Sequence, residues 1–107
     1  AHSASAGVGS SLTPTLRARG TVLTNSAGVY AEPMADTVIA GVLHFVRGLD
    51  FAVRQQATAT WDQGPFVRDS TDLRELDECR VLVVGAGGIG QAVARRFSAL
   101  GCACTGV

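Results

Sequence analysis

A short apolar run that breaks into a cluster of glycines constrains this chain more than any other feature. The run VLVV occupies residues 81–84, the cluster GAGGIG occupies residues 85–90, and QAVARRF follows at residues 91–97. An unbroken apolar run is typical of a central parallel strand buried on both faces, here residues 80–84. The apolar residues after the cluster recur at helical spacing, which predicts a helix over residues 89–100. The glycines are therefore expected to form a tight turn between strand and helix.

The glycine spacing in that turn is Gly85-x-Gly87-x-x-Gly90. The first glycine permits a sharp turn, the second leaves room for a pyrophosphate near the backbone, and the third lets the helix pack closely on the strand. The start of the helix adds unpaired N–H groups and a positive dipole end. Ordinary glycine turns can have the same spacing, but the position between a buried strand and an amphipathic helix indicates a dinucleotide-binding turn.

The residues after the helix complete a strand–helix–strand unit. Gly101 is a typical helix stop, and residues 102–107 are expected to begin a second strand. The acidic residue that binds the adenosine ribose is expected about 20 residues after the first glycine. That position falls near Thr105 or just beyond it, so these residues do not separate NAD from NADP.

A long apolar helix is predicted over residues 33–53, with Pro33 in its first turn. Its apolar stripe has spacings of three and four and consists of Met34, Val38, Val42, Phe45, Leu49 and Ala52. Further apolar residues widen the stripe, namely Ile39, Leu43 and Val46. A helix that is apolar around most of its circumference is expected to be buried on two sides, between domains or against another subunit.

The remaining segments are shorter. Residues 1–10 are predicted to be a glycine-rich loop, residues 12–19 a short helix, and residues 21–24 a strand that precedes a turn at 25–28. Residues 57–72 lack a clear period and are predicted to form a loop held down by aromatic anchors, Trp61 and Phe66.

Composition excludes several classes of protein. The chain has 107 residues and zero net charge, so no basic face indicates nucleic acid as a partner. No apolar run reaches the roughly 18 residues of a membrane span, and the first residues lack a signal-peptide pattern. The three cysteines, Cys79, Cys102 and Cys104, lack metal-site spacing and predict reduced, buried thiols in a cytoplasmic protein. The first and last residues lead us to expect a fragment of a longer chain.

The order of these motifs resembles the D-isomer-specific 2-hydroxyacid dehydrogenase family. The resembling segments are residues 5–9, 22–25, 31–36, 45–47, Trp61, and 73–76 through 91–94. The resemblance implies a partial Rossmann fold, an α/β doubly wound parallel sheet truncated after its first strand–helix–strand unit. It also implies that the tail of a flavodoxin-like substrate domain, residues 1–32, precedes the incomplete NAD-binding domain, residues 33–107.

The resemblance implies roles for individual residues. Three glycines, Gly85, Gly87 and Gly90, would form the turn, and Gly88 and Ile89 would supply the backbone amides nearest the pyrophosphate. The remaining implied roles belong to Val38, near the nicotinamide or simply in the core, and to Val8 and Gly9, at the substrate carboxylate. Tyr30 lies near the hinge and could reach the cleft, but it is interpreted as a packed hinge aromatic, and His44 is interpreted as structural. The sequence departs from the family in several places, among them Gly88, where an arginine is commoner, and Asp36, where a glutamate is more frequent.

The activity implied by the resemblance is hydride transfer between a nicotinamide cofactor and a D-2-hydroxy or 2-keto acid. The family's catalytic arginine, glutamate and histidine match positions beyond the C-terminus, so we expect no catalytic residue in this chain and no activity from it alone. The expected cofactor is NAD, with NADP open, and no metal is expected. The resemblance also implies a homodimer formed through residues 33–53. The alternatives are a non-catalytic, NAD-sensing regulatory domain and another Rossmann oxidoreductase, which the long helix disfavours.

Overall fold

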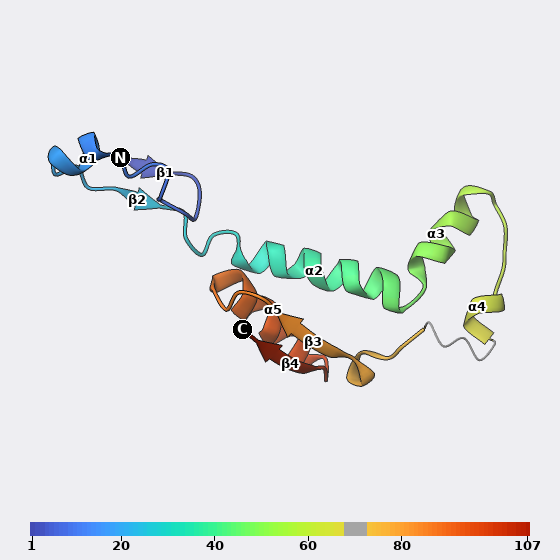
Figure 1. The fold of residues 1–107 in the computed structure, drawn as a ribbon. Coiled ribbons are helices and arrows are strands. Elements are labelled where there is room, and N and C mark those ends of the chain that lie inside the picture. Colours follow the sequence, from blue (N-terminus) through green and yellow to red (C-terminus); the bar gives the residue numbers. More distant parts are fainter. Residues whose placement is uncertain (68–72) are drawn as a thin grey trace.

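The structure is a computed structural model that describes residues 1–67 and 73–107. Figure 1 shows an elongated molecule in which α2 (Ala31–Val46) runs alongside a small α/β unit at the C-terminal end. Its principal extents are 66 × 33 × 17 Å and its radius of gyration is 20.3 Å. A compact domain of this length has a radius of gyration of about 13 Å. The chain is therefore far more extended than an independent globular domain.

Two parallel pairs of strands organise the ends of the chain (Figure 1). At the N-terminal end, β1 (His2–Ser3) pairs with β2 (Thr24–Asn25). At the C-terminal end, β3 (Arg80–Val83) pairs with β4 (Ala103–Gly106). The other elements are α1 (Pro14–Ala18), α3 (Leu49–Ala57), α4 (Gly64–Val67), a 3₁₀ helix η1 (Leu76–Glu78) and α5 (Gly88–Ala99).

The unit formed by β3, α5 and β4 confirms the predicted strand–helix–strand arrangement. The two strands are parallel and in register from Arg80 opposite Ala103 to Val83 opposite Gly106. The core lies between these strands, α5 and α2, and its largest fully buried side chain is Phe97 of α5. Val83 packs toward this core, whereas Leu82 points to the other, exposed face.

The prediction that β3 is buried on both faces is therefore wrong for this chain. Only one face of the β3–β4 pair carries a helical layer, since α2 and α5 both contribute to the same core. Within residues 1–67 and 73–107, nothing covers Leu82 or Val84 on the opposite face.

α2 contacts the core through two small side chains and through part of the predicted stripe. Ala31 and Ala35 are buried, and Ile39 and Val42 pack against the same core. Phe45, another member of the predicted stripe, is 68% exposed. Alanine allows α2 and α5 to approach closely, and Phe45 is left on the outside. The expectation of burial on two sides is thus not met among the described residues.

The predicted single helix over residues 33–53 is wrong, because it breaks at Gly48. This glycine has φ +67°, in the left-handed region that favours glycine, and it separates α2 from α3. The loop before β3 holds the break in place. The N–H of Arg74 donates to the carbonyl of Val46 at 3.0 Å, and the Arg47 guanidinium donates to the carbonyl of Arg74 at 3.0 Å.

The aromatic residues after α3 behave differently from the prediction. Trp61 is 86% exposed, so it does not hold the loop down. Phe66 belongs to α4, and its ring lies 6.2 Å from that of Phe51. The last part of the predicted loop, residues 68–72, lies outside the described residues.

The N-terminal segment is short but ordered by hydrogen bonds. The side chain of Thr13 caps α1, and its hydroxyl accepts from the N–H of Leu16 at 3.3 Å. The strand predicted at residues 21–24 is shorter and lies slightly later, as β2. β1 lies within the predicted loop 1–10, and β2 pairs with it.

No helix in the described part of the chain has the length and apolar character needed to cross a membrane.

Candidate functional site

The turn between β3 and α5 is shaped by the backbone of Gly85. This residue has φ +98°, a conformation that only glycine adopts at little cost. Its N–H donates to the carbonyl of Val107 at 2.7 Å, which continues the β3–β4 ladder into the turn. The carbonyl of Ala86 accepts from the Gln91 side-chain amide at 2.8 Å. The turn is therefore held from both the strand side and the helix side.

Gly87 and Gly90 are needed for different reasons. A Cβ at residue 90 would collide with the carbonyl oxygen of Gly85 and would lie 3.1 Å from a methyl carbon of Val83. Gly90 therefore allows α5 to pack on the strand. A Cβ at residue 87 would meet nothing within 4 Å. The space beside Gly87 is open, as expected for a position where a ligand approaches the backbone.

The first turn of α5 presents backbone N–H groups to this open space. Gly87 is the N-cap, it makes no side-chain cap hydrogen bond, and its carbonyl accepts from the N–H of Gln91 at 2.9 Å. The N–H groups of Gly88, Ile89 and Gly90 precede that first helical bond and have no helical acceptor. The first turn contains no acidic residue. This donor set fits a pyrophosphate, which is stabilised by free amides and by the positive end of the helix dipole.

A cleft of about 470 Å³ lies over the turn. One wall is the glycine turn itself, and the other comes from the segment that leads into α2 together with one residue of the loop after β1. The residues of this second wall are Ala6, Ala27, Gly28, Tyr30 and Ala31. A Cβ at Gly88 would lie 4.0 Å from the Cβ of Ala31, so the two walls approach each other closely at this point.

The structure brings all five residues predicted for the pyrophosphate site into this cleft. They are Gly85, Gly87, Gly88, Ile89 and Gly90. The second wall was not predicted. Tyr30, which the sequence suggested as a packed hinge aromatic, is half exposed and lines the cleft instead. Glycine and alanine carry little periodic signal, so the sequence offered no cue for the other residues.

The other predicted site residues lie outside this cleft. Val38 lines an adjoining cleft of about 590 Å³ that also includes Gly85 and Ile89. The carbonyl of Val8 accepts from the N–H groups of Ser11 and Leu12, at 3.0 and 2.9 Å. Neither Val8 nor Gly9 is among the residues that line the cleft over the turn. Their roles stay predictions.

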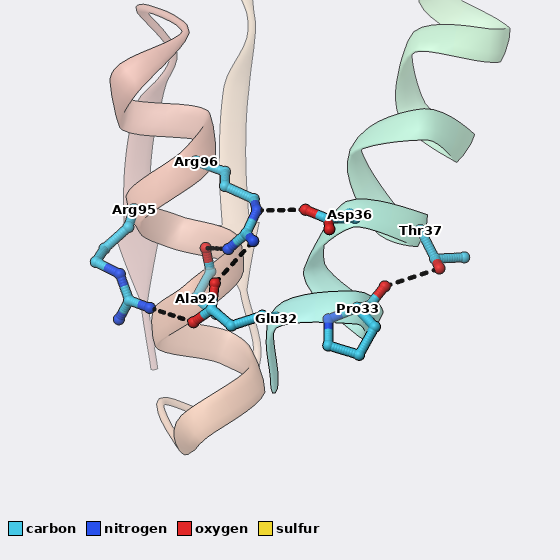
Figure 2. Close-up of polar contacts among 7 residues, drawn as sticks. All are labelled: Glu32, Pro33, Asp36, Thr37, Ala92, Arg95 and Arg96. Atoms are coloured by element: carbon cyan, nitrogen blue, oxygen red, sulfur yellow. Dashed lines mark hydrogen bonds and ion pairs between the residues drawn. The ribbon is translucent and has the colours of Figure 1, made fainter. Parts of the chain in front are cut away.

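A network of charged residues joins α2 to α5 beside the cleft, as Figure 2 shows. Glu32 pairs with Arg95 at 2.9 Å and with Arg96 at 2.7 Å, and Arg96 also pairs with Asp36 at 2.8 Å. The hydrogen bond to Glu32 raises the pKa of Arg96 above its usual value. This network was not predicted from the sequence, because its members are about 60 residues apart along the chain.

The cysteines lie at the far end of the sheet from the turn. Cys102 is 6% exposed, and its thiol donates to the carbonyl of Leu76 at 2.9 Å. Burial raises the pKa of this thiol. Cys79 and Cys104 pack against the same core but are only partly buried, so the prediction of buried thiols is fully met by Cys102 alone. In the described ranges, no group of three ligating side chains is arranged to hold a metal ion.

The family model described as "D-isomer specific 2-hydroxyacid dehydrogenase, NAD binding domain" matches residues 39–107, more than half of the chain. This chain belongs to the D-isomer specific 2-hydroxyacid dehydrogenase family. The match confirms the family suggested by the motifs and the partial Rossmann fold. It also confirms NAD as the expected cofactor, because the matching model is that of an NAD-binding domain.

Relatives support the same assignment. The chain is 31% identical over 85 residues to glyoxylate/hydroxypyruvate reductase HPR3 of Arabidopsis thaliana, a match that covers 78% of this chain and 25% of that protein. A D-isomer specific 2-hydroxyacid dehydrogenase family protein of Aeromonas salmonicida has a similar structure, with 28% identity and a TM-score of 0.74. That match covers 98% of this chain and 31% of the other.

A D-lactate dehydrogenase of Aquifex aeolicus, solved with NAD and lactic acid, shares the fold. It has 23% identity and a TM-score of 0.73, and the match covers 99% of this chain and 35% of that protein. The chain therefore spans between a quarter and about a third of the length of these relatives.

Proposed function

We propose that this chain holds the pyrophosphate of NAD within an oxidoreductase that acts on D-2-hydroxy and 2-keto acids. The observation that carries the proposal is the contrast between two glycines of the turn. Gly90 is packed against the strand, whereas the space beside Gly87 is open and faces free amides of α5. This contrast supports a turn built for a phosphate group, and the family supports a nicotinamide cofactor.

In this proposal the turn binds and orients the cofactor. The N–H groups of Gly88 and Ile89 donate to the pyrophosphate, and Val38 lies toward the nicotinamide. When bound, NAD accepts a hydride from the substrate carbon or returns it. The backbone of Val8 and Gly9 lies toward the substrate carboxylate. Since the family's catalytic arginine, glutamate and histidine match no position here, we propose that the 107-residue chain alone is inactive.

We also propose that residues 1–32 belong to the substrate domain and residues 33–107 to the cofactor domain. Two observations support a boundary near the start of α2. The β1–β2 pair and the β3–β4 pair are separate sheets. Gly28, with φ +87°, lies between them in a turn that lines the cleft.

We propose the cytoplasm as the location of the protein, which is consistent with its three free cysteines.

Binding of NADH to the full-length protein tests this function, with Gly87→Ala as the decisive variant. A methyl group at residue 87 projects into the space proposed for the pyrophosphate, so NADH affinity should fall at least roughly tenfold while the fold is kept. Fluorescence titration measures the affinity. Gly41→Ala is the matched control, because Gly41 lies on α2 with open space around it and should bind NADH normally.

Turnover separates an enzyme from a regulatory domain. Glyoxylate, hydroxypyruvate and pyruvate, each with NADH, are suitable first substrates for the full-length protein. Oxidation of NADH that depends on one of these acids supports the dehydrogenase. NADH binding without turnover of any 2-keto acid supports the non-catalytic, NAD-sensing alternative. Equal NADH affinity of the wild type and the Gly87→Ala variant would contradict the proposal that the turn holds the pyrophosphate.

A further inference from the structure

We propose that Glu32 is a positioning residue for the cofactor-binding turn. Its carboxylate clamps α2 against α5 and thereby sets the width of the cleft over the glycine turn. The inference rests on the proposed function, because it concerns the fit of NAD in that cleft.

The first support is the way in which Glu32 is held. Its two carboxylate oxygens go to different residues: Oε1 pairs with Arg95 at 2.9 Å and Oε2 with Arg96 at 2.7 Å. Neighbouring residues on a helix point about 100° apart around its axis. Figure 2 shows the two arginines reaching Glu32 from different sides of α5. Contacts from two directions restrain both the sliding and the rotation of α2 against α5.

Asp36 strengthens the same clamp. It lies one helical turn after Glu32, on the same face of α2, and accepts from Nε of Arg96 at 2.8 Å. Arg96 thus spans one turn of α2 and holds two carboxylates at once. It also donates to the carbonyl of Ala92 on its own helix at 3.3 Å, which fixes the direction of its side chain.

The second support is the position of the clamp relative to the cleft. Glu32 directly follows Ala31, which lines the cleft and faces Gly88 at the start of α5. Ala35 of α2 and Ala92 of α5, both completely buried, belong to the core shared by the two helices. Alanine has no flexible side chain that could absorb a displacement, and packed interiors transmit small movements. A shift at the start of α2 therefore changes the gap between Ala31 and Gly88.

The third support is that these ion pairs are poorly placed to serve stability alone. The side chains of Glu32, Asp36 and Arg95 are 58%, 69% and 62% exposed, and only that of Arg96, at 26%, is partly covered. Exposed ion pairs contribute little to stability, because water competes for both partners and side-chain freedom is lost. The expected effect of the clamp is therefore on the geometry of the cleft more than on the melting temperature.

The test compares NADH affinity and melting temperature in full-length variants. Glu32→Gln keeps the shape of the side chain and removes its charge. We expect its NADH affinity to fall roughly two- to thirtyfold, the range typical of residues that modulate a distant site, with little change in melting temperature. In a double variant, Glu32→Gln with Arg95→Gln, the loss should not be larger than in Glu32→Gln alone.

Two matched controls separate positioning from stability. Asp50→Asn removes the partly exposed Asp50–Arg54 ion pair of α3, at 3.0 Å, whose residues do not line the cleft over the turn. This variant should leave NADH affinity unchanged. Leu76→Ala removes apolar contact from the η1 side of the core, outside the lining of both clefts. It should lower the melting temperature without changing NADH affinity at temperatures well below the transition.

The outcomes are distinct. Unchanged NADH affinity in Glu32→Gln overturns the inference, and so does a loss that Leu76→Ala reproduces at an equal drop in melting temperature. If the wild-type protein fails to bind NADH, the proposed function is overturned and this inference with it. If the wild type binds NADH and the Glu32→Gln variant binds it equally well, this inference is overturned and the proposed function stands.

Discussion

At the scale of single residues, Gly90 has the strictest steric requirement in the turn. We predict that Gly90→Ala destabilises the protein by about 1–3 kcal/mol or more, the range for overpacking a filled site. The added methyl group would meet the carbonyl oxygen of Gly85, which the backbone of the turn holds in place. Chemical denaturation measures the change. Gly87→Ala is the control, and comparable losses in both variants would contradict the steric account.

The thiol of Cys102 gives a prediction about pH and reactivity. Burial raises its pKa, so the folded state binds the thiol proton more tightly than the unfolded state. The corresponding stability is present below the ordinary thiol pKa of about 8.5 and is lost as pH rises through the higher folded-state pKa. We expect native Cys102 to react with iodoacetamide more slowly than Cys79, which is only half buried. Peptide mass spectrometry after timed labelling checks the order.

The residue-scale features differed in how well the sequence predicted them. The glycine spacing could be recognised in the sequence because the turn is local: its three glycines, Gly85, Gly87 and Gly90, lie within six residues of chain. The Glu32–Arg96 pair could not be predicted from the sequence, since nothing near either residue specifies a partner about 60 positions away. Tyr30 was misjudged for a related reason. Its exposure depends on where the turn before α5 comes to lie.

At the scale of elements, the break between α2 and α3 rests on Gly48. We predict that Gly48→Ala destabilises the protein by about 1–2 kcal/mol, the cost of a left-handed backbone for a residue with a Cβ. Its new methyl carbon would also lie 2.8 Å from a Leu73 methyl, though that side chain can move. Thermal unfolding measures the loss. Gly41→Ala, in the exposed middle of α2, should instead stabilise by about 0.5–1 kcal/mol.

The same break explains why the long helix was predicted incorrectly. Apolar residues keep their helical spacing through Gly48, and Gly41 lies in the same run without interrupting it. The spacing of apolar residues therefore cannot distinguish a glycine that a helix tolerates from a glycine that ends the helix. The difference comes from the loop before β3, whose residue Arg74 exchanges hydrogen bonds with the end of α2. By contrast, β3, α5 and β4 were predicted to within two residues at each end, because their glycine boundaries and apolar spacing agree.

At the scale of the whole molecule, the outer face of α2 and α3 remains apolar. We propose that this face forms a homodimer interface in the full-length protein. Its exposed apolar side chains are Met34, Phe45, Leu49 and Val53. Large apolar side chains gathered on one exposed face are typical of protein interfaces.

We predict that Phe45→Glu shifts the full-length protein from dimer to monomer, because a charge would replace one of the most exposed apolar side chains of this face. Multi-angle light scattering at several concentrations checks the mass. Arg54→Glu, a charge change on the more polar side of α3, serves as the control and should leave the dimer intact. A wild-type protein that is already monomeric would contradict the interface.

The extended shape has a hydrodynamic consequence for the 107-residue chain. A radius of gyration of 20.3 Å is that of a compact protein of roughly 350 residues, about three times the length of this chain. A single copy should therefore migrate through a porous gel with the apparent mass of a trimer. Its frictional ratio in sedimentation velocity should be well above that of a sphere, and this ratio distinguishes a rod-like monomer from a true assembly.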